Sequence, residues 1–148
     1  MTSFQQHNLD DVNMYRAMMN LTPLTLDSAL SAFALTGSEE LACDHMPHGH
    51  FIAESTGNPP PLFSMGFNTM AGENQGDPNG WNVLSANPTT NETMQIDQIM
   101  LDMFDEGPPG DAGEHGHYEN IMSTEFTKFG AGLIEVDGML YLTNDFSN

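Results

Sequence analysis

The sequence predicts a mixed α/β protein, and two observations carry this prediction. Three segments place apolar residues at helical spacing, and the C-terminal segment holds two β-rich runs separated by a turn signal. The chain has 148 residues, a length that fits one domain with a buried core. We therefore expect residues 1–148 to form a single domain.

The first two predicted helices lie in the N-terminal third of the chain. Apolar residues recur about every third position from Leu9 to Met19, and this helix should end before Pro23. The second helix follows Asp27, whose side chain can cap it, and its apolar face extends to about Cys43. Because Cys43 falls on this predicted helix face, we expect a buried, unreactive thiol.

The third predicted helix has the clearest boundaries. Asn91 is a candidate N-cap, and the sequence Gly107-Pro108-Pro109 stops the helix. Between them runs an apolar stripe that we expect to pack in the core, formed by Ile96, Ile99, Met100 and Met103.

The C-terminal segment is predicted to be a β-hairpin. Residues 132–136 and 139–146 are β-rich and flank Asp137-Gly138, a pair suited to a type I′ turn. We expect the hairpin to lie centrally in the sheet, with Phe146 buried. Upstream, a stretch rich in Gly, Pro and Asn runs from about residue 45 to 90, and a loop of this length is usually functional or contains short elements.

Charge and composition exclude several classes of partner. The chain carries 21 acidic residues against Arg16 and Lys128, a formal charge of −19. Without a basic patch it gains nothing from nucleic-acid phosphates, and an anionic membrane surface repels it. No apolar stretch approaches the ~20 residues needed to span a bilayer. The lone Cys43 excludes an internal disulfide.

Histidine placement is the sharpest chemical signal in the sequence. Five of the six histidines fall in two short clusters within predicted loops, residues 45–50 and 115–117. Residues two apart in an extended segment point the same way, so either cluster could present paired imidazoles to Zn²⁺ or a similar cation. Exposed polar histidines without a ligand are the equally weighted alternative.

Two glutamates could complete such a site. Glu73 stands in the sequence Gly72-Glu73-Asn74, where the glycine allows close approach of another segment, and Glu106 ends the third helix before its proline stop. Either one alone is typical of a solvated carboxylate.

Several segments, in order, resemble the CAP superfamily of cysteine-rich secretory proteins, antigen 5 and pathogenesis-related proteins. They run from about residue 9 to 146, so the resemblance covers nearly the whole chain. The resembling segments are residues 12–16 with Leu24, residues 72–74, 103–106, 116–122, 129–133 and 140–146.

The resemblance implies a three-layer α-β-α sandwich with a central, mainly antiparallel sheet and a cleft lined by a His, Glu, Glu, His tetrad. By the same resemblance, His117, Glu73 and Glu106 match three members of the tetrad. His50 fits best as the fourth, and His48 is the alternative. The cysteines of eukaryotic members are absent and Met103 replaces the usual Trp, which favours a bacterial secreted member. Residues 1–11 lack the basic and apolar regions of a signal peptide, so we expect an exported chain to be in its mature form.

Two functions follow from this interpretation. The first is an extracellular binding or interaction domain, with an unknown ligand or protein partner, whose cleft binds a divalent cation such as Zn²⁺. The alternative is a metal-dependent hydrolase of peptides, esters or glycans. In that enzyme His117 with His50 or His48 would hold Zn²⁺, and Glu73 or Glu106 would be the general base.

Overall fold

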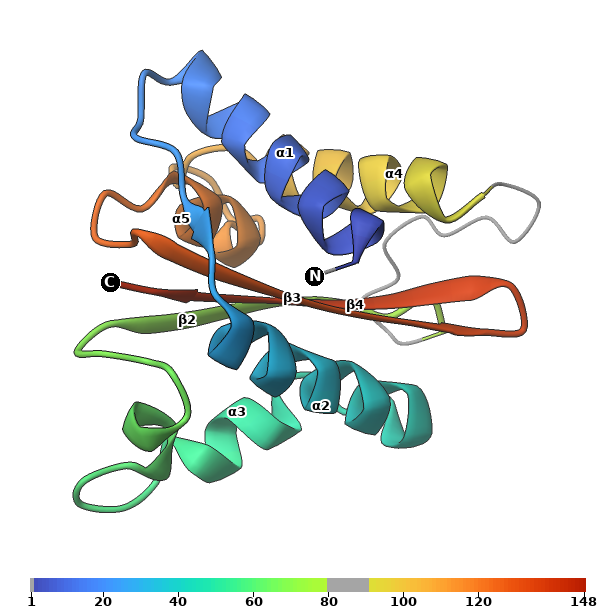
Figure 1. Cartoon of the computed structure of the whole chain (residues 1–148). Coiled ribbons are helices and arrows are strands. Elements are labelled where there is room, and N and C mark those ends of the chain that lie inside the picture. Colours follow the sequence, from blue (N-terminus) through green and yellow to red (C-terminus); the bar gives the residue numbers. More distant parts are fainter. Residues whose placement is uncertain (1, 80–90) are drawn as a thin grey trace.

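The computed structural model describes residues 2–79 and 91–148, and it has the predicted mixed α/β architecture (Figure 1). Its elements, in chain order, are α1 (Ser3–Met18), β1 (Thr25–Leu26), α2 (Ser28–Asp44), α3 (Gly49–Glu54), the 3-10 helix η1 (Pro61–Ser64), β2 (Ala71–Gly76), α4 (Glu92–Asp105), α5 (Gly116–Met122), β3 (Lys128–Val136) and β4 (Met139–Ser147).

The sheet has the strand order β1-β3-β4-β2, with β1 parallel to β3 and the other pairs antiparallel. The hairpin prediction is confirmed, because β3 and β4 are the two central strands. Asp137 and Gly138 connect them with φ angles of 52° and 79°, both left-handed as a type I′ turn requires. Phe146 is fully buried beneath the helices.

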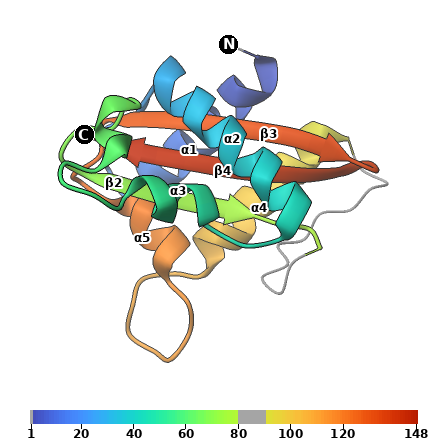
Figure 2. The same cartoon turned by 90° about the horizontal axis from the view of Figure 1, so that it is seen from below.

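Helices cover both faces of the sheet. Figure 1 shows α1, α4 and α5 on one face and α2 and α3 on the other, and Figure 2 shows α2 and α3 lying across their face. The main core lies on the α1–α4 side and includes the predicted stripe of the third helix, which is fully buried: Ile96, Ile99, Met100 and Met103.

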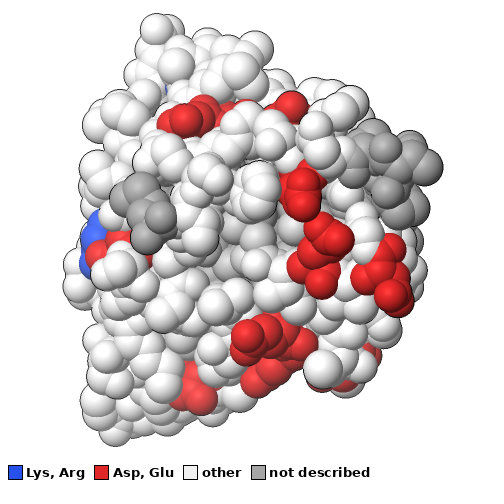
Figure 3. All heavy atoms as spheres, turned by 45° about the vertical axis from the view of Figure 1, so that its right-hand side comes forward, with Lys and Arg blue, Asp and Glu red and all other residues white. Residues whose placement is uncertain are grey.

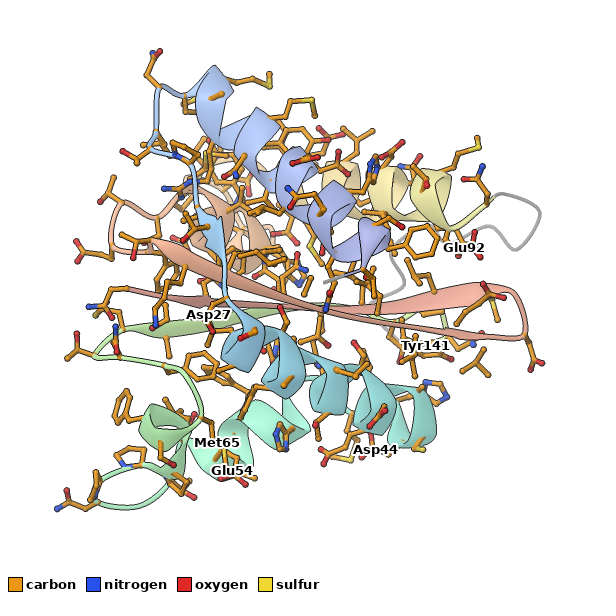
Figure 4. All side chains as sticks on the ribbon, viewed as in Figure 1. Asp27, Asp44, Glu54, Met65, Glu92 and Tyr141 are labelled. Carbon is orange, nitrogen blue, oxygen red and sulfur yellow. The ribbon has the colours of Figure 1, made fainter. Side chains whose placement is uncertain are left out.

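The predicted helix caps are confirmed. The Asp27 carboxylate accepts hydrogen bonds from the backbone N–H groups of Ala29 and Leu30 at 2.9 and 3.0 Å, and it lies at the start of α2 in Figure 4. The Asn91 side chain accepts a hydrogen bond from the backbone N–H of Met94 at 3.0 Å. These side chains satisfy N–H groups that have no partner within the helix.

Two details of the sequence prediction were wrong. Cys43 is exposed, because it lies two residues after the buried Leu41 and so on the opposite face of α2. Met18 and Met19 are exposed, because α1 ends there and the chain turns away from the core. The long segment of residues 45–90 contains short elements, as one of the two expectations had it: α3, η1 and β2. Its residues 80–90 lie outside the described part of the chain.

The contact between α2 and the sheet depends on two glycines of β3. A Cβ atom at Gly130 would lie 2.3 Å from the backbone carbon of Leu30, and one at Gly132 would lie 2.1 Å from that of Ala34. The helix backbone therefore rests directly on β3, and the Ser38 hydroxyl donates to the Gly132 carbonyl at 2.9 Å.

Arg16 and Lys128 both donate hydrogen bonds to backbone carbonyls of the fold. The Arg16 guanidinium is 1% exposed and donates to the carbonyls of Thr22, Ile121 and Ser123 at 2.8–2.9 Å. Burial lowers its pKa. The Lys128 ammonium donates to the Gly66 carbonyl at 3.0 Å. The face in Figure 3 accordingly carries several groups of acidic side chains and almost no cationic atoms.

Candidate functional site

A polar pocket of about 280 Å³ opens beside β2, the edge strand of the sheet. Figure 2 shows β2 next to α5 at this edge. The described residues that line the pocket include neither lysine nor arginine: they are Pro47, His48, Glu73, Asn74, Glu114, Gly116, His117 and Asn120. The lining holds two carboxylates and two imidazoles, so its negative charge and its ligand atoms favour a cation over an anion.

The Gly72-Glu73-Asn74 segment lies within β2, and each of its residues has a separate task. A Cβ atom at Gly72 would lie 2.8 Å from the amide oxygen of Asn120, so the glycine allows α5 to approach the strand. The Asn74 amide donates to the His117 carbonyl at 3.1 Å and accepts from the Asn120 amide at 2.8 Å. This segment therefore fixes α5 against the sheet edge.

His48 is held on the other side of β2. Its backbone is left-handed, with a φ of 62°, and its N–H donates to the Gln75 side-chain oxygen at 2.6 Å. Its imidazole Nδ1 lies 2.8 Å from Oε1 of Glu73, whose side chain is 1% exposed. An ionised carboxylate only accepts hydrogen bonds, so Nδ1 carries the hydrogen, and in the neutral imidazole Nε2 then keeps its lone pair.

His117 has the same arrangement on α5. Its Nδ1 lies 2.5 Å from Oε1 of Glu106, and the second oxygen of Glu106 accepts from the backbone N–H groups of His117 and Tyr118 at 3.0 and 3.3 Å. Glu106 is the residue that follows α4, so its position ties the end of α4 to the start of α5. A carboxylate at the start of a helix is electrostatically favourable.

The four residues thus form two His–Glu pairs rather than four converging ligands. Each glutamate occupies Nδ1 of one histidine, and the Nε2 atoms of His48 and His117 are left for a ligand. Neighbouring residues of a strand point to opposite faces, so Glu73 contacts His48 on one side of the sheet edge and Asn74 contacts the backbone of His117 on the other. Both histidines therefore line one pocket. Carboxylate-oriented imidazoles of this kind are typical of metal sites.

Asp145, which sequence reasoning missed, lies behind Glu73. The two residues are directly opposite on β4 and β2, and Asp145 is fully buried. Burial and the adjacent Glu73 carboxylate raise the pKa of Asp145 well above its ordinary value. A protonated Asp145 can donate to Oε2 of Glu73, a buried atom with no other hydrogen-bond partner in the described part of the chain. Asp145 is a charged residue within the apolar run of residues 139–146, and this was the sequence signal that could have identified it.

The remaining clustered histidines lie elsewhere. His50 packs against Phe33 of α2, with ring centroids 4.3 Å apart and the ring planes tilted by 40°, and does not line the pocket. His45 pairs with Asp77 at 2.9 Å. His115 donates from Nδ1 to the Glu106 and Gly107 carbonyls at 2.9 Å. The second cluster was predicted as a loop, but His117 is in α5.

Comparisons with known proteins agree with this fold. Among solved structures, Schistosoma mansoni venom allergen-like protein 4 has a TM-score of 0.63 at 14% identity, covering 99% of this chain and 89% of its own. NaASP2, solved with Zn²⁺, has a TM-score of 0.65 at 14% identity, covering 99% of this chain and 80% of its own.

A third structure is an extracellular protein from Bacillus anthracis that contains an SCP domain. It has a TM-score of 0.64 at 19% identity and covers 98% of this chain, which spans only 40% of that protein. A search of curated protein sequences finds no significant match. Among the described residues, no helix is both long and apolar enough to cross a bilayer.

The family assignment rests on the sequence profile as well as on the fold. The model described as "CAP: Cysteine-rich secretory protein family" matches residues 9–143, which include Glu73, Glu106 and both pocket histidines. The mixed α/β architecture is the one seen in the solved relatives. The chain belongs to the cysteine-rich secretory protein (CAP) family.

Proposed function

We propose that this chain is a secreted CAP protein that binds a divalent cation, best Zn²⁺, in the pocket beside β2 and acts as an extracellular binding module for a partner not yet known. One observation carries the proposal: His48 and His117 line the same pocket, and each has Nδ1 held by a glutamate while Nε2 is free. Neutral imidazole with its second nitrogen bonded to a carboxylate is a good ligand for Zn²⁺.

The charge of the pocket supports a cation. Glu73 and Glu114 line it, Glu106 lies behind His117, and no lining residue is cationic. Two imidazoles are fewer protein ligands than most zinc sites have, so water or a partner's group would complete the coordination. NaASP2, which has the same fold, was solved with Zn²⁺.

The positions of the glutamates support binding rather than hydrolysis. Glu106 accepts three hydrogen bonds from His117 and Tyr118. Glu73 bonds His48 through one oxygen, and its other oxygen is buried against Asp145. A general base needs a free oxygen near a metal-bound water, and neither glutamate offers one in this arrangement.

Secretion, and a bacterial source, are part of the same proposal. The Bacillus anthracis relative is described as extracellular, and the chain lacks the cysteine pairs that eukaryotic family members use. A strongly acidic surface also suits a cation-rich exterior.

The direct test is long-range ¹H–¹⁵N NMR of the six histidine side chains during titration with Zn²⁺. We expect the Nε2 signals of His48 and His117 to shift together, with the Nδ1-bound hydrogen retained. His50, which lies outside the pocket, is the internal control. Zn²⁺ that leaves His48 and His117 unchanged would refute the proposal.

A further inference from the structure

A second group of metal-ligating side chains lies between α1 and α4, away from the pocket. His7 and Asp11 are one helical turn apart on α1, and Asp97 is on α4. The Nε2 atom of His7 lies 2.5 Å from Oδ1 of Asp97 and 3.8 Å from Oδ2 of Asp11. The three ligand atoms all lie within 4.8 Å of one another. None of the three residues lines the pocket.

Asp11 is the informative member of this group. Its side chain is only 14% exposed, and its Oδ2 atom is buried with no hydrogen-bond partner among the described residues. Burial of an unpaired carboxylate oxygen is costly, so a buried one usually faces a cation or a hydrogen-bond donor. His7 is its only ion-pair partner among the described residues, and His7 lies closer to Asp97.

Neither arginine nor lysine is available to neutralise the two aspartates, and His7 can offset at most one of the two negative charges. Arg16 is on α1 but donates to three backbone carbonyls, and Lys128 donates to the carbonyl of Gly66. Asp10 adds a further negative charge on the same turn of α1. Two facing carboxylates with one imidazole therefore hold an excess of negative charge.

We propose that His7, Asp11 and Asp97 form a second divalent-cation site that links α1 to α4. Nε2 of His7, Oδ2 of Asp11 and one oxygen of Asp97 would be the protein ligands, with water in the remaining positions. One nitrogen and two carboxylate oxygens suit Zn²⁺, Co²⁺ or Mn²⁺, whereas Ca²⁺ prefers oxygen ligands alone.

The geometry needs only side-chain adjustments to receive an ion. Ligands at about 2.0–2.2 Å from a tetrahedral ion are roughly 3.3–3.5 Å apart, compared with the 2.5 and 3.8 Å observed from His7 to the two aspartates. Asp97 is 54% exposed, so its side chain is free to move outward. Helices α1 and α4 already pack together through the core, so the ion would bind to a largely formed site.

The test is Zn²⁺ stoichiometry and affinity by titration calorimetry, with Co²⁺ absorption as a second readout. The variants are Asp11→Asn and Asp97→Asn, and the matched control is Asp10→Asn, an exposed aspartate on the same helix. A fourth variant, His48→Ala, removes the pocket site alone.

We expect two equivalents of Zn²⁺ in wild type and Asp10→Asn, and one in Asp11→Asn, Asp97→Asn and His48→Ala. The loss of a direct ligand should exceed the ~10–100-fold cost of losing an outer partner. If only the pocket proposal fails, His48→Ala will match wild type. The α1–α4 site is overturned if both aspartate variants bind with the stoichiometry and affinity of wild type. Asp97 is exposed, so that variant tests the site even if Asp11→Asn fails to fold.

Discussion

Glu73 and Asp145 lie directly opposite each other on β2 and β4, with both side chains buried, so that one carboxyl group supports the other beneath the pocket. Two negative charges at this spacing in a buried site would repel strongly, and a proton on Asp145 removes that repulsion. The proton also provides a donor for the buried oxygen of Glu73. Glu73 therefore positions His48, and the protonated side chain of Asp145 in turn positions Glu73.

The first prediction concerns this pair and pH. Because the folded-state pKa of Asp145 is raised, its contribution to stability is full below the unfolded pKa of about 3.9 and is lost as the pH rises toward the folded value. Asp145→Asn keeps a neutral donor and cannot ionise. We expect its melting temperature to match wild type only below about pH 4 and to exceed it increasingly as the pH rises, until Asp145 ionises in the folded wild type.

Asp145→Ala is the control for that experiment. It removes the donor and leaves the Glu73 oxygen unpaired, which should cost about 1–3 kcal/mol relative to Asp145→Asn at every pH. Equal pH dependence in wild type and Asp145→Asn would show that Asp145 is ionised in the folded protein.

The second prediction concerns the two pocket glutamates. Glu73→Gln and Glu106→Gln weaken the orientation and basicity of the histidines without removing a metal ligand. Pocket affinity for Zn²⁺, followed by histidine NMR, should fall about 10–100-fold in each. Glu119→Gln, an exposed change on α5, is the matched control and should have no effect.

The same variants separate a binding module from a hydrolase. We expect no turnover when the Zn²⁺-loaded wild type is screened against ester, peptide and glycan substrates. Metal-dependent turnover in wild type that disappears in either glutamate variant, with Zn²⁺ still bound, would identify an enzyme. General bases typically contribute ~10²–10⁴ in rate, so the loss would be unmistakable.

A third prediction concerns Arg16, which joins α1 to the end of α5. Arg16→Met should destabilise the fold by about 3 kcal/mol, since three carbonyls lose a charged donor in a buried position. Urea unfolding measures this difference. Lys128→Met removes a hydrogen bond to the Gly66 carbonyl and a 4.0 Å ion pair with Asp27, both partly exposed, and should cost no more than about 1 kcal/mol. Similar losses in the two variants would contradict a special role for Arg16.

The fourth prediction tests the contact between α2 and β3. Gly132→Ala places a methyl group 2.1 Å from the backbone of Ala34, and backbone cannot rotate out of the way as a side chain can. We expect a loss of about 3 kcal/mol or more, read as a fall in the unfolding midpoint. Gly110→Ala, where nothing lies within 4 Å of the added carbon, should leave stability unchanged. A harmless Gly132→Ala would mean that α2 shifts freely over the sheet.

The elements with strong apolar periodicity were predictable from the sequence. The three long helices and the β3–β4 hairpin bury continuous apolar stripes, and their caps and turn have clear residue signals. By contrast, β2 has the sequence AGENQG, which lacks apolar alternation. Its stability comes from pairing with β4 and from polar contacts that only the tertiary structure creates.

The candidate site was predictable in its composition but not in its pairing. The resemblance pointed to Glu73, Glu106 and His117, but it favoured His50 over His48. These two histidines are only two residues apart, and the sequence does not show that the left-handed backbone of His48 directs its imidazole toward Glu73 on the edge strand. His7, Asp11 and Asp97 were missed altogether. Their ligands come from two helices about 90 residues apart, and such a set has no local sequence pattern.

The placement of Arg16 and Lys128 has a consequence for proteolysis. Trypsin-like proteases cut only after Arg and Lys, so this chain offers them two bonds in all. The bond after Arg16 lies inside helix α1, beside a side chain that is 1% exposed, and the bond after Lys128 lies in a strand paired on both sides. A protease needs an accessible, extended segment, which neither bond provides until the fold opens. Digestion by trypsin will therefore follow the unfolded population rather than local loop motion, and the folded protein will survive in fluids rich in such enzymes.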